Sequence, residues 1–364
     1  MKDLAKIDKN FELKSSIGKD NLKFYNIEEA PFRIYGVFKE KDKFCRMPEA
    51  VAKTVSENVS ILNYETSGGR VRFITDSPYV AINITMNAVG KAPHFALTGS
   101  AGLDLYVKED GKDVYRGTFI PPYDLDKSYE RIIEFKTQFH SEPIRAEREI
   151  TINFPPYSGV NDLYIGLDGD SYVKEAPDYK YEKPIVFYGH SITQGGCVTR
   201  PGYTYPAIIS RRFDCNFINL GFSGSAKGEV EIAEYIAGLD MEVFVYDYDN
   251  NAPTPEHLEK THERMFKIIR EKNPDLPIII MTATPRLYTN GTVKERSEIV
   301  YKTYENAKNN GDKNVYFING REAYKDLDDG ICSATVEGTH LNDLGFTYIA
   351  KAVGDMIEKI KEWR

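Results

Sequence analysis

The stretch IVFYGHSITQGG at residues 185–196 decides the fold of the C-terminal half of the chain. Its four apolar residues predict a short buried strand, and the glycine-bearing turn that follows places Ser191 just beyond that strand. Downstream, short apolar runs alternate with longer helical stretches, which is typical of a parallel sheet with helices on both faces. We expect strands at 185–188, 217–219, 243–246, 277–281 and 315–318, and helices at 205–213, 230–239, 256–271, 293–309 and 344–361.

The N-terminal half has the pattern of an antiparallel fold. Between residues 21 and 172, several short segments alternate apolar and polar side chains, and turn-forming clusters separate them. We expect strands at 70–75, 79–85, 103–108, 132–135 and 149–154, and a helix only at 48–55. Many short strands with few helices predict a β-sandwich or jelly roll. Because the polar, proline-bearing segment 168–184 suits a linker, we predict an N-terminal domain at 1–176 and a C-terminal domain at 177–364.

Composition argues against several classes of protein. The chain has 364 residues and a formal net charge of -8, and its 47 basic residues form no cluster, so no nucleic-acid partner is expected. No apolar run approaches the roughly 20 residues of a membrane span. Residues 1–16 lack the apolar core of a secretory signal. We therefore expect a cytoplasmic protein without membrane contact, whose oligomeric state a single chain does not reveal.

The cysteine and histidine pattern predicts neither disulfides nor a metal cofactor. Cys45, Cys197, Cys215 and Cys332 are scattered without CxxC spacing, which favours free thiols over a disulfide framework. Whether Cys197 and Cys332 pair is left open. No HExxH motif and no clustered Cys/His spacing occurs, so we expect no metal and no cofactor.

Four segments carry the candidate chemistry. They are YGHSITQGG at 188–196 with Ser191, NLGFSGS at 219–225, DYDNNAP at 247–253 and EGTHLND at 337–343 with His340. A serine, a histidine with an acid three residues before it, and main-chain or amide N–H donors are the groups of nucleophilic acyl transfer. Each segment alone is also typical of a turn, and the absence of GKS or GKT disfavours a phosphate loop in the first. The first three segments share a place at the carboxyl ends of predicted parallel strands, which favours one site, and the fourth lies just before the last predicted helix.

These segments, in this order, resemble the SGNH (GDSL-like) hydrolase superfamily. The stretches YGHSITQGGCVTRPG, NLGFSG, DYDNNAP and EGTHLNDLGF are similar to the motifs of a bacterial branch with an N-terminal β-sandwich, as are RMPEAVAK and GGRVRFITDSPYVAI upstream. The resemblance implies a flavodoxin-like α/β hydrolase domain after a jelly-roll-like sandwich. It implies Ser191 as nucleophile, His340 as general base and Glu337 as triad acid. The oxyanion hole would consist of the Ser191 main-chain N–H, Gly224 and Asn251.

Three residues depart from the pattern of that branch. His190 replaces Ser or Asp beside the nucleophile, Leu341 replaces Pro, and Glu337 replaces Asp. Glutamate is one methylene longer than aspartate, so its carboxylate either reaches His340 from another angle or leaves catalysis to a Ser–His dyad. None of the three removes a group that the chemistry requires.

The predicted function is hydrolysis of small acyl esters. We expect a serine esterase that acts on small-molecule or carbohydrate esters, with acetyl as the leading acyl group. One alternative is an acyltransferase that uses a hydroxyl acceptor, and another is a carbohydrate-binding protein whose hydrolase site has lapsed. Arg200 and Arg286 are candidates for binding a polar or anionic substrate, the alternative being arginines of the surface or the packing.

Overall fold

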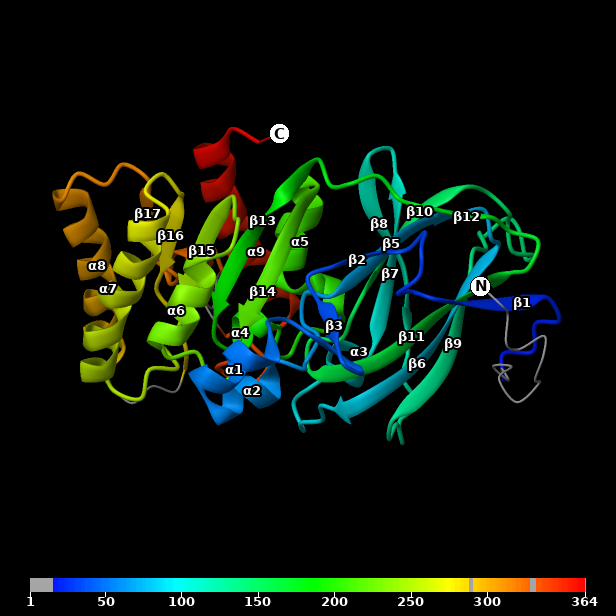
Figure 1. Cartoon of the computed structure of the whole chain (residues 1–364), viewed down its shortest axis with the longest axis horizontal. Coiled ribbons are helices and arrows are strands. Elements are labelled where there is room, and N and C mark those ends of the chain that lie inside the picture. Colours follow the sequence, from blue (N-terminus) through cyan, green and yellow to red (C-terminus); the bar gives the residue numbers. More distant parts are fainter. Residues whose placement is uncertain (1–15, 288–290, 328–331, 364) are drawn as a thin grey trace.

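The structure, a computed structural model, describes residues 16–287, 291–327 and 332–363. A β-rich N-terminal part and an α/β C-terminal part lie next to each other along the longest axis (Figure 1). Residues 1–15 of the predicted N-terminal domain and residue 364 of the C-terminal one lie outside the described residues. The exact domain boundary stays a prediction, but the chain passes from one part to the other between β12 (Val173–Lys174) and β13 (Tyr181–Gly189).

The N-terminal part is an antiparallel β-sandwich, which confirms the predicted fold class. One sheet has the order β1 (Leu22–Asn26), β11 (Ser158–Asp168), β6 (Tyr79–Val89) and β9 (Ser128–Glu134). The other has the order β12, β5 (Arg70–Thr75), β10 (Arg148–Asn153), β7 (Leu103–Glu109) and β8 (Lys112–Phe119), and β2 (Arg33–Tyr35) pairs with β5. Alternate side chains of both sheets, such as Phe73 and Ile82, share one buried core. A hairpin of β3 (Phe38–Glu40) and β4 (Lys43–Cys45) and the short helix α3 (Leu97–Ser100) complete this part.

The C-terminal part is a five-stranded parallel sheet. Its order is β14 (Cys215–Gly221), β13, β15 (Val243–Asp247), β16 (Ile278–Met281) and β17 (Val315–Ile318). In chain order this is 2-1-3-4-5, the arrangement of flavodoxin-like folds. Strand order reverses at β13, because β14 lies on one side of it and β15 on the other. Ligands of such sheets bind beyond the carboxyl ends of the strands at this switch point.

Helices cover both faces of the parallel sheet, as predicted. On β13, Val186 and Tyr188 face one core and Ile185 and Phe187 face the other. The first core contains α6 (Val230–Ala237), α7 (Pro255–Lys272) and α8 (Val293–Asn309). The second contains α5 (Tyr205–Phe213) and α9 (Asp343–Lys361), and just past α9 the ring of Trp363 stacks on Tyr181 at a centroid distance of 4.0 Å.

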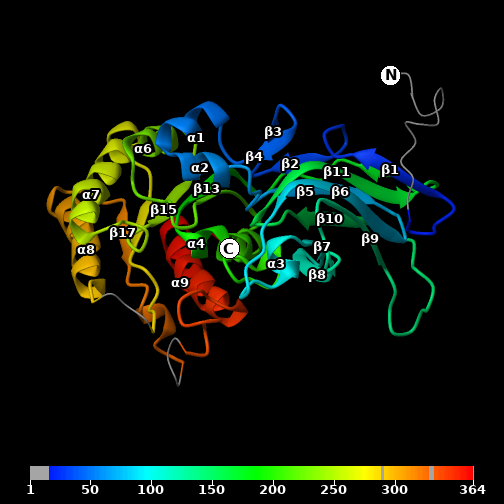
Figure 2. The same cartoon turned by 90° about the horizontal axis from the view of Figure 1, so that it is seen from below.

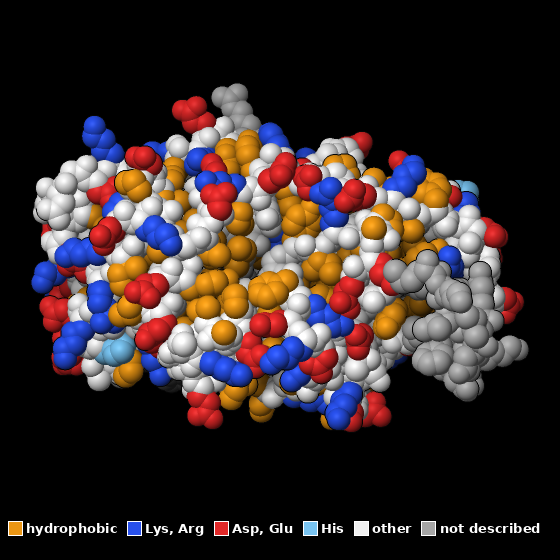
Figure 3. Space-filling model, in the orientation of Figure 1, with side chains coloured by type: hydrophobic (Ala, Val, Ile, Leu, Met, Phe, Trp, Pro, Cys, Tyr) orange, Lys and Arg blue, Asp and Glu red, His pale blue; other side chains and the backbone are white. Residues whose placement is uncertain are grey.

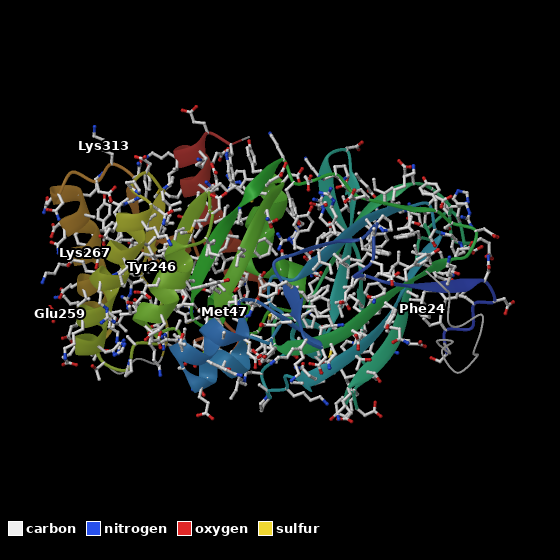
Figure 4. The ribbon with its side chains drawn as sticks, in the orientation of Figure 1. Phe24, Met47, Tyr246, Glu259, Lys267 and Lys313 are labelled. Atoms are coloured by element: carbon white, nitrogen blue, oxygen red, sulfur yellow. The ribbon has the colours of Figure 1, made fainter. Side chains whose placement is uncertain are left out.

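Two helices of the N-terminal half belong to the core of the C-terminal part. The expected helix at 48–55 is α1 (Glu49–Val55), and the sequence did not predict α2 (Glu57–Leu62), which follows it directly. Met47, Ala52, Val55 and Val59 are buried in the core that α6 and α7 share with the sheet. Figure 2 shows α1 and α2 beside α6, and Figure 4 labels Met47 where the two parts meet. These two helices therefore belong to the core of the C-terminal part, whereas the sandwich core consists of N-terminal residues alone.

The surface shows mixed charge. On the face drawn in Figure 3, acidic and basic side chains are interspersed, and hydrophobic side chains gather near its middle. Within the described residues, every helix is too short or too polar to cross a bilayer.

Candidate active site

Ser191 stands at the first position of a short helix, α4 (Ser191–Gln194), directly after β13. The preceding His190 caps this helix, since its Nδ1 accepts the main-chain N–H of Ile192 at 3.2 Å. A Cβ atom on Gly189 would lie 2.1 Å from Oδ1 of Asp247, so only glycine fits there. The glycine that the motif places before His190 thus allows β13 to approach Asp247 of the neighbouring strand closely, just before Ser191.

The structure brings Ser191, His340 and Glu337 into one hydrogen-bonded chain. Ser191 Oγ lies 3.0 Å from Nε2 of His340, and Nδ1 of the same ring lies 2.7 Å from Oε1 of Glu337. That oxygen also accepts the main-chain N–H of His340 at 3.1 Å. A carboxylate on Nδ1 fixes the tautomer that carries its proton there, which leaves Nε2 free to accept the serine proton. The longer glutamate side chain therefore reaches the position that the branch pattern gives to aspartate.

The loop that carries His340 is held at both ends. The main-chain N–H of Val336 donates to the carbonyl of His340 at 2.9 Å, and Asn342 caps α9 through the N–H of Gly345. Thr199 donates its main-chain N–H to Asp343 at 3.0 Å, and its hydroxyl also binds that carboxylate. The segment after the nucleophile and the loop that bears the base are therefore joined directly.

The candidate oxyanion donors lie after three adjacent strands. Gly224 has φ +66° and open space beside its Cα, whereas a Cβ on Gly221 would lie 2.3 Å from the main-chain nitrogen of Gln194. Among the described residues, the main-chain N–H groups of Ser191 and Gly224 have no acceptor. Nδ2 of Asn251 donates to the carbonyl of Phe222 at 3.0 Å, and an amide NH₂ has a second hydrogen to offer. These features favour Gly224 over Gly221, and the roles of Gly224 and Asn251 stay predictions.

His190 and Asp247 lie next to each other in the interior, beside the nucleophile. Nε2 of His190 lies 3.6 Å from Oδ2 of Asp247, and Oδ1 of Asp247 accepts the hydroxyl of Thr193 at 2.8 Å. Burial, with a contribution from Arg286, lowers the pKa of His190 to about 3, and burial raises the pKa of Asp247 well above its usual range. His190 is therefore uncharged at neutral pH. It is a structural residue of residues 189–196, the nucleophile turn.

Residues of the N-terminal part form hydrogen bonds with the nucleophile turn, and the sequence did not predict these contacts. The hydroxyl of Ser67 donates to the carbonyl of Gln194 at 2.6 Å, and the phenol of Tyr157 donates to the carbonyl of Ser191 at 3.2 Å. The side-chain amide of Gln194 binds Glu65 and the carbonyl of Pro156. No local pattern could have revealed these contacts, because the partners are 34 or more residues apart in the chain.

Arg46 fastens the N-terminal part to the end of β14. Its guanidinium is buried and donates to the carbonyls of Gly221, Asn219 and Leu62. Burial lowers the pKa of Arg46 to about 10. The guanidinium therefore remains charged at neutral pH. Two of its carbonyl partners, those of Asn219 and Gly221, belong to segment 219–225 of the site.

The two candidate substrate arginines lie in different surroundings. The guanidinium of Arg200 lies over the rings of Tyr115 and Tyr203 at 4.3 and 4.4 Å, the position of a packed arginine. Arg286 is half-buried, and its charge contributes to lowering the pKa of His190. Of the two arginines, Arg286 is therefore the one whose charge acts on a residue next to the nucleophile.

The four cysteines are free thiols. Cys45, Cys197 and Cys215 are buried, and Cys332 is exposed. The sequence left open whether Cys197 and Cys332 form a disulfide, and in the structure they do not. Burial raises the pKa of Cys197 to about 12, so the thiol is protonated at neutral pH.

Comparison with protein-family models finds a match over each part of the chain. Residues 182–358 match the GDSL-like lipase/acylhydrolase family, and residues 22–173 match a family called GxDLY, described as the N-terminus of SGNH-hydrolase-type esterases. The sequence GLDLY occurs here at residues 102–106. Its buried Asp104 accepts the main-chain N–H of Gly202 at 2.8 Å and the amide of Asn153 at 2.8 Å, so the motif docks the sandwich beside the nucleophile turn. This docking role of GLDLY is a tertiary contact that was not predicted from the sequence.

Solved structures of similar fold include hydrolases and a transferase. A protein from Bacteroides ovatus described as a GDSL-like lipase has 29% sequence identity and a TM-score of 0.83, over 94% of this chain and 99% of that one. The salicylyl-acyltransferase SsfX3 of a tetracycline biosynthetic pathway has 18% identity and a TM-score of 0.71, over 92% and 96%. An acetyl xylan esterase from Butyrivibrio proteoclasticus has 14% identity and a TM-score of 0.56, over 94% and 99%. No curated protein sequence matches the chain.

Proposed function

Since this chain belongs to the SGNH (GDSL-like) hydrolases, we propose that it is a carboxylic ester hydrolase acting through an acyl-enzyme on Ser191. The observation that carries the proposal is the hydrogen-bonded chain from Glu337 through His340 to Ser191. A serine within 3.0 Å of a histidine whose tautomer is fixed by a carboxylate is arranged for nucleophilic catalysis.

The reaction has two balanced halves. Nε2 of His340 takes the proton of Ser191 as Oγ attacks the ester carbonyl, and the resulting oxyanion faces the N–H groups of Ser191 and Gly224 and the amide of Asn251. The tetrahedral intermediate collapses, His340 gives its proton to the departing alkoxide, and an acyl-serine remains. Water then repeats the sequence, returning the acid and the free enzyme. Glu337 stabilises the imidazolium in each half.

The proposed substrate is a small acyl ester, with acetylated carbohydrates first. The support is the shared fold with an acetyl xylan esterase and with carbohydrate esterases of family two. This is an analogy at the level of the fold. The sandwich supports it as well, because Tyr157 and Ser67 bring that domain to the edge of the nucleophile turn.

Acyl transfer to a hydroxyl acceptor is the second candidate. It is favoured by the structural similarity to a salicylyl-acyltransferase over nearly the whole chain. The first half of the reaction is the same, and an alcohol replaces water in the second. A binding protein with a lapsed site is disfavoured, because the serine, the histidine and the carboxylate remain in hydrogen-bond contact.

The test is a screen of short-chain p-nitrophenyl esters and acetylated saccharides against wild type and Ser191→Ala. We expect turnover by wild type, its loss in the variant, and unchanged circular dichroism. A fluorophosphonate probe should label wild type and Ser223→Ala, a neighbouring serine, but not Ser191→Ala. Turnover retained by Ser191→Ala would refute the assignment, and absence of an adduct on wild type would favour a binding protein. Added alcohols that divert the acyl group from water would identify a transferase.

A further inference from the structure

A histidine of the N-terminal part lies against the ring of His340. His94 belongs to the segment between β6 and α3, and its ring stacks on that of His340 at a centroid distance of 5.5 Å and an interplanar angle of 30°. His94 is partly exposed. Among the residues that the structure describes, neither of its ring nitrogens has a hydrogen-bond partner. Both nitrogens are therefore available to a ligand.

Cys197 lies close to both of these rings. It follows the two glycines after α4 and has φ +71°, a left-handed backbone conformation that L side chains other than Asn and Asp seldom adopt. Its thiol has no hydrogen-bond partner within the described part of the chain. A glycine would adopt this conformation without strain, so the local backbone gives no reason for a cysteine.

The three side chains together offer a set of metal ligands. The thiol of Cys197 and one ring nitrogen each of His94 and His340 lie within 4.8 Å of one another. A tetrahedral zinc ion, with bonds of about 2.0–2.3 Å, holds its ligand atoms roughly 3.5 Å apart, so a movement of about 1 Å would close the set. The partial exposure of His94 leaves room for such a movement of its side chain.

We propose that His94, Cys197 and His340 bind a zinc ion that inhibits the enzyme. Nδ1 of His340 is held by Glu337, so Nε2 is the nitrogen left to coordinate. A carboxylate on the opposite ring nitrogen is the usual support of a zinc-bound histidine. The thiol releases its proton to water on binding, and the cation stabilises the thiolate that burial alone disfavours. With Nε2 on the metal, the ring no longer accepts the proton of Ser191.

Inhibition rests on the proposed function, but metal binding does not, so the two are measured separately. Cobalt(II), added to the full chain as a substitute for zinc, should produce thiolate-to-metal absorption in wild type and in the inactive Ser191→Ala variant. The absorption should be lost in Cys197→Ser. It should be kept in Cys332→Ser, the control variant, which removes an exposed cysteine outside the proposed site. Absorption that survives in Cys197→Ser, or that is absent from wild type, would overturn the proposal whether or not the chain is an esterase.

Ester hydrolysis tests the inhibitory role. We expect Zn²⁺ to inhibit wild type reversibly, with activity restored by EDTA. The zinc concentration for half-inhibition should rise roughly tenfold or more in His94→Gln and in Cys197→Ser, while each variant keeps its activity in the absence of metal. Half-inhibition at the same concentration in wild type and in both variants would contradict the proposal, since zinc would then act elsewhere.

Discussion

At the scale of single residues, one oxygen of Glu337 has two tasks, because it accepts both the main-chain N–H and the Nδ1–H of His340. In Glu337→Gln the amide oxygen can still accept both hydrogens, but the charge that stabilises the imidazolium is gone. We expect kcat/KM to fall by about 10- to 100-fold in Glu337→Gln and by about 1,000-fold or more in His340→Ala. Steady-state kinetics on a p-nitrophenyl ester measures both. Equal losses would mean that the carboxylate is indispensable, and an unchanged Glu337→Gln would indicate a Ser–His dyad.

Asn251 provides a second prediction at this scale. If its amide faces the oxyanion, Asn251→Ala should lower kcat by about 100- to 1,000-fold with little change in KM, because the interaction forms only as charge develops on the substrate oxygen. Asn250→Ala, at the adjacent residue, is the control and should stay within about twofold of wild type. The opposite result would shift the predicted donor by one residue along the loop.

At the scale of secondary-structure elements, a buried histidine connects α7 to α8. His262 of α7 binds the hydroxyl of Thr303 in α8 at 2.8 Å and stacks on the rings of Tyr246 and Tyr248. Burial lowers its pKa from 6.5 to about 3. The unfolded chain therefore binds a proton between these values and the folded chain does not, so this contribution to stability is present above pH 6.5 and is lost as the pH falls towards 3.

The expected outcome is a weaker acid sensitivity in His262→Leu. Between pH 6.5 and about 3, one such group adds a slope of up to about 1.4 kcal/mol per pH unit to the free energy of unfolding. Urea denaturation at pH 7 and pH 4.5 should therefore show a smaller loss of stability in the variant than in wild type. The lost hydrogen bond to Thr303 lowers stability at both pH values and cancels in the comparison. Identical losses in both proteins would contradict the buried neutral state of His262.

The sequence predicted the elements that have a strong local period. The helix expected at 293–309 coincides with α8, because a long amphipathic run has a clear helical period. The strand expected at 315–318 coincides with β17, because it is a short apolar run with clear ends. Helix α2 was missed because its six residues are too few to establish a period. Strand β13 begins at Tyr181 rather than at residue 185, since pairing with β14 recruits polar residues before the apolar run.

Among the candidate site residues, too, those in local motifs were predictable from the sequence and those that depend on tertiary contacts were not. Ser191, Glu337 and His340 are recognisable because each lies in a short local motif, and the structure brings them together. Arg200 proves to be packed between aromatic rings. The contacts that Ser67 makes with the nucleophile turn join residues more than 100 positions apart, and such tertiary contacts leave no local pattern.

At the scale of the whole molecule, α1 and α2 of the N-terminal half pack into a core of the parallel-sheet part, and polar contacts join the two parts at the site. Val59 of α2 is 1% exposed in the core of the parallel-sheet part, whereas Ile61 of the same helix is 61% exposed. We expect Val59→Asp to lower the free energy of unfolding by about 3 kcal/mol or more, because it buries a charge without a partner. Ile61→Asp should change it by less than about 0.5 kcal/mol. Chemical denaturation followed by circular dichroism compares them, and similar stabilities would mean that α2 is not part of that core.

The position of Trp363 has an optical consequence. It is the only tryptophan in the sequence, and it is buried against Tyr181 and Phe213, which both belong to the C-terminal part. Its emission therefore reports on one half of the chain alone, while the 25 tyrosines report on both. Unfolding recorded through the two fluorophores would reveal directly whether the halves melt as one cooperative unit, without any label or engineered probe.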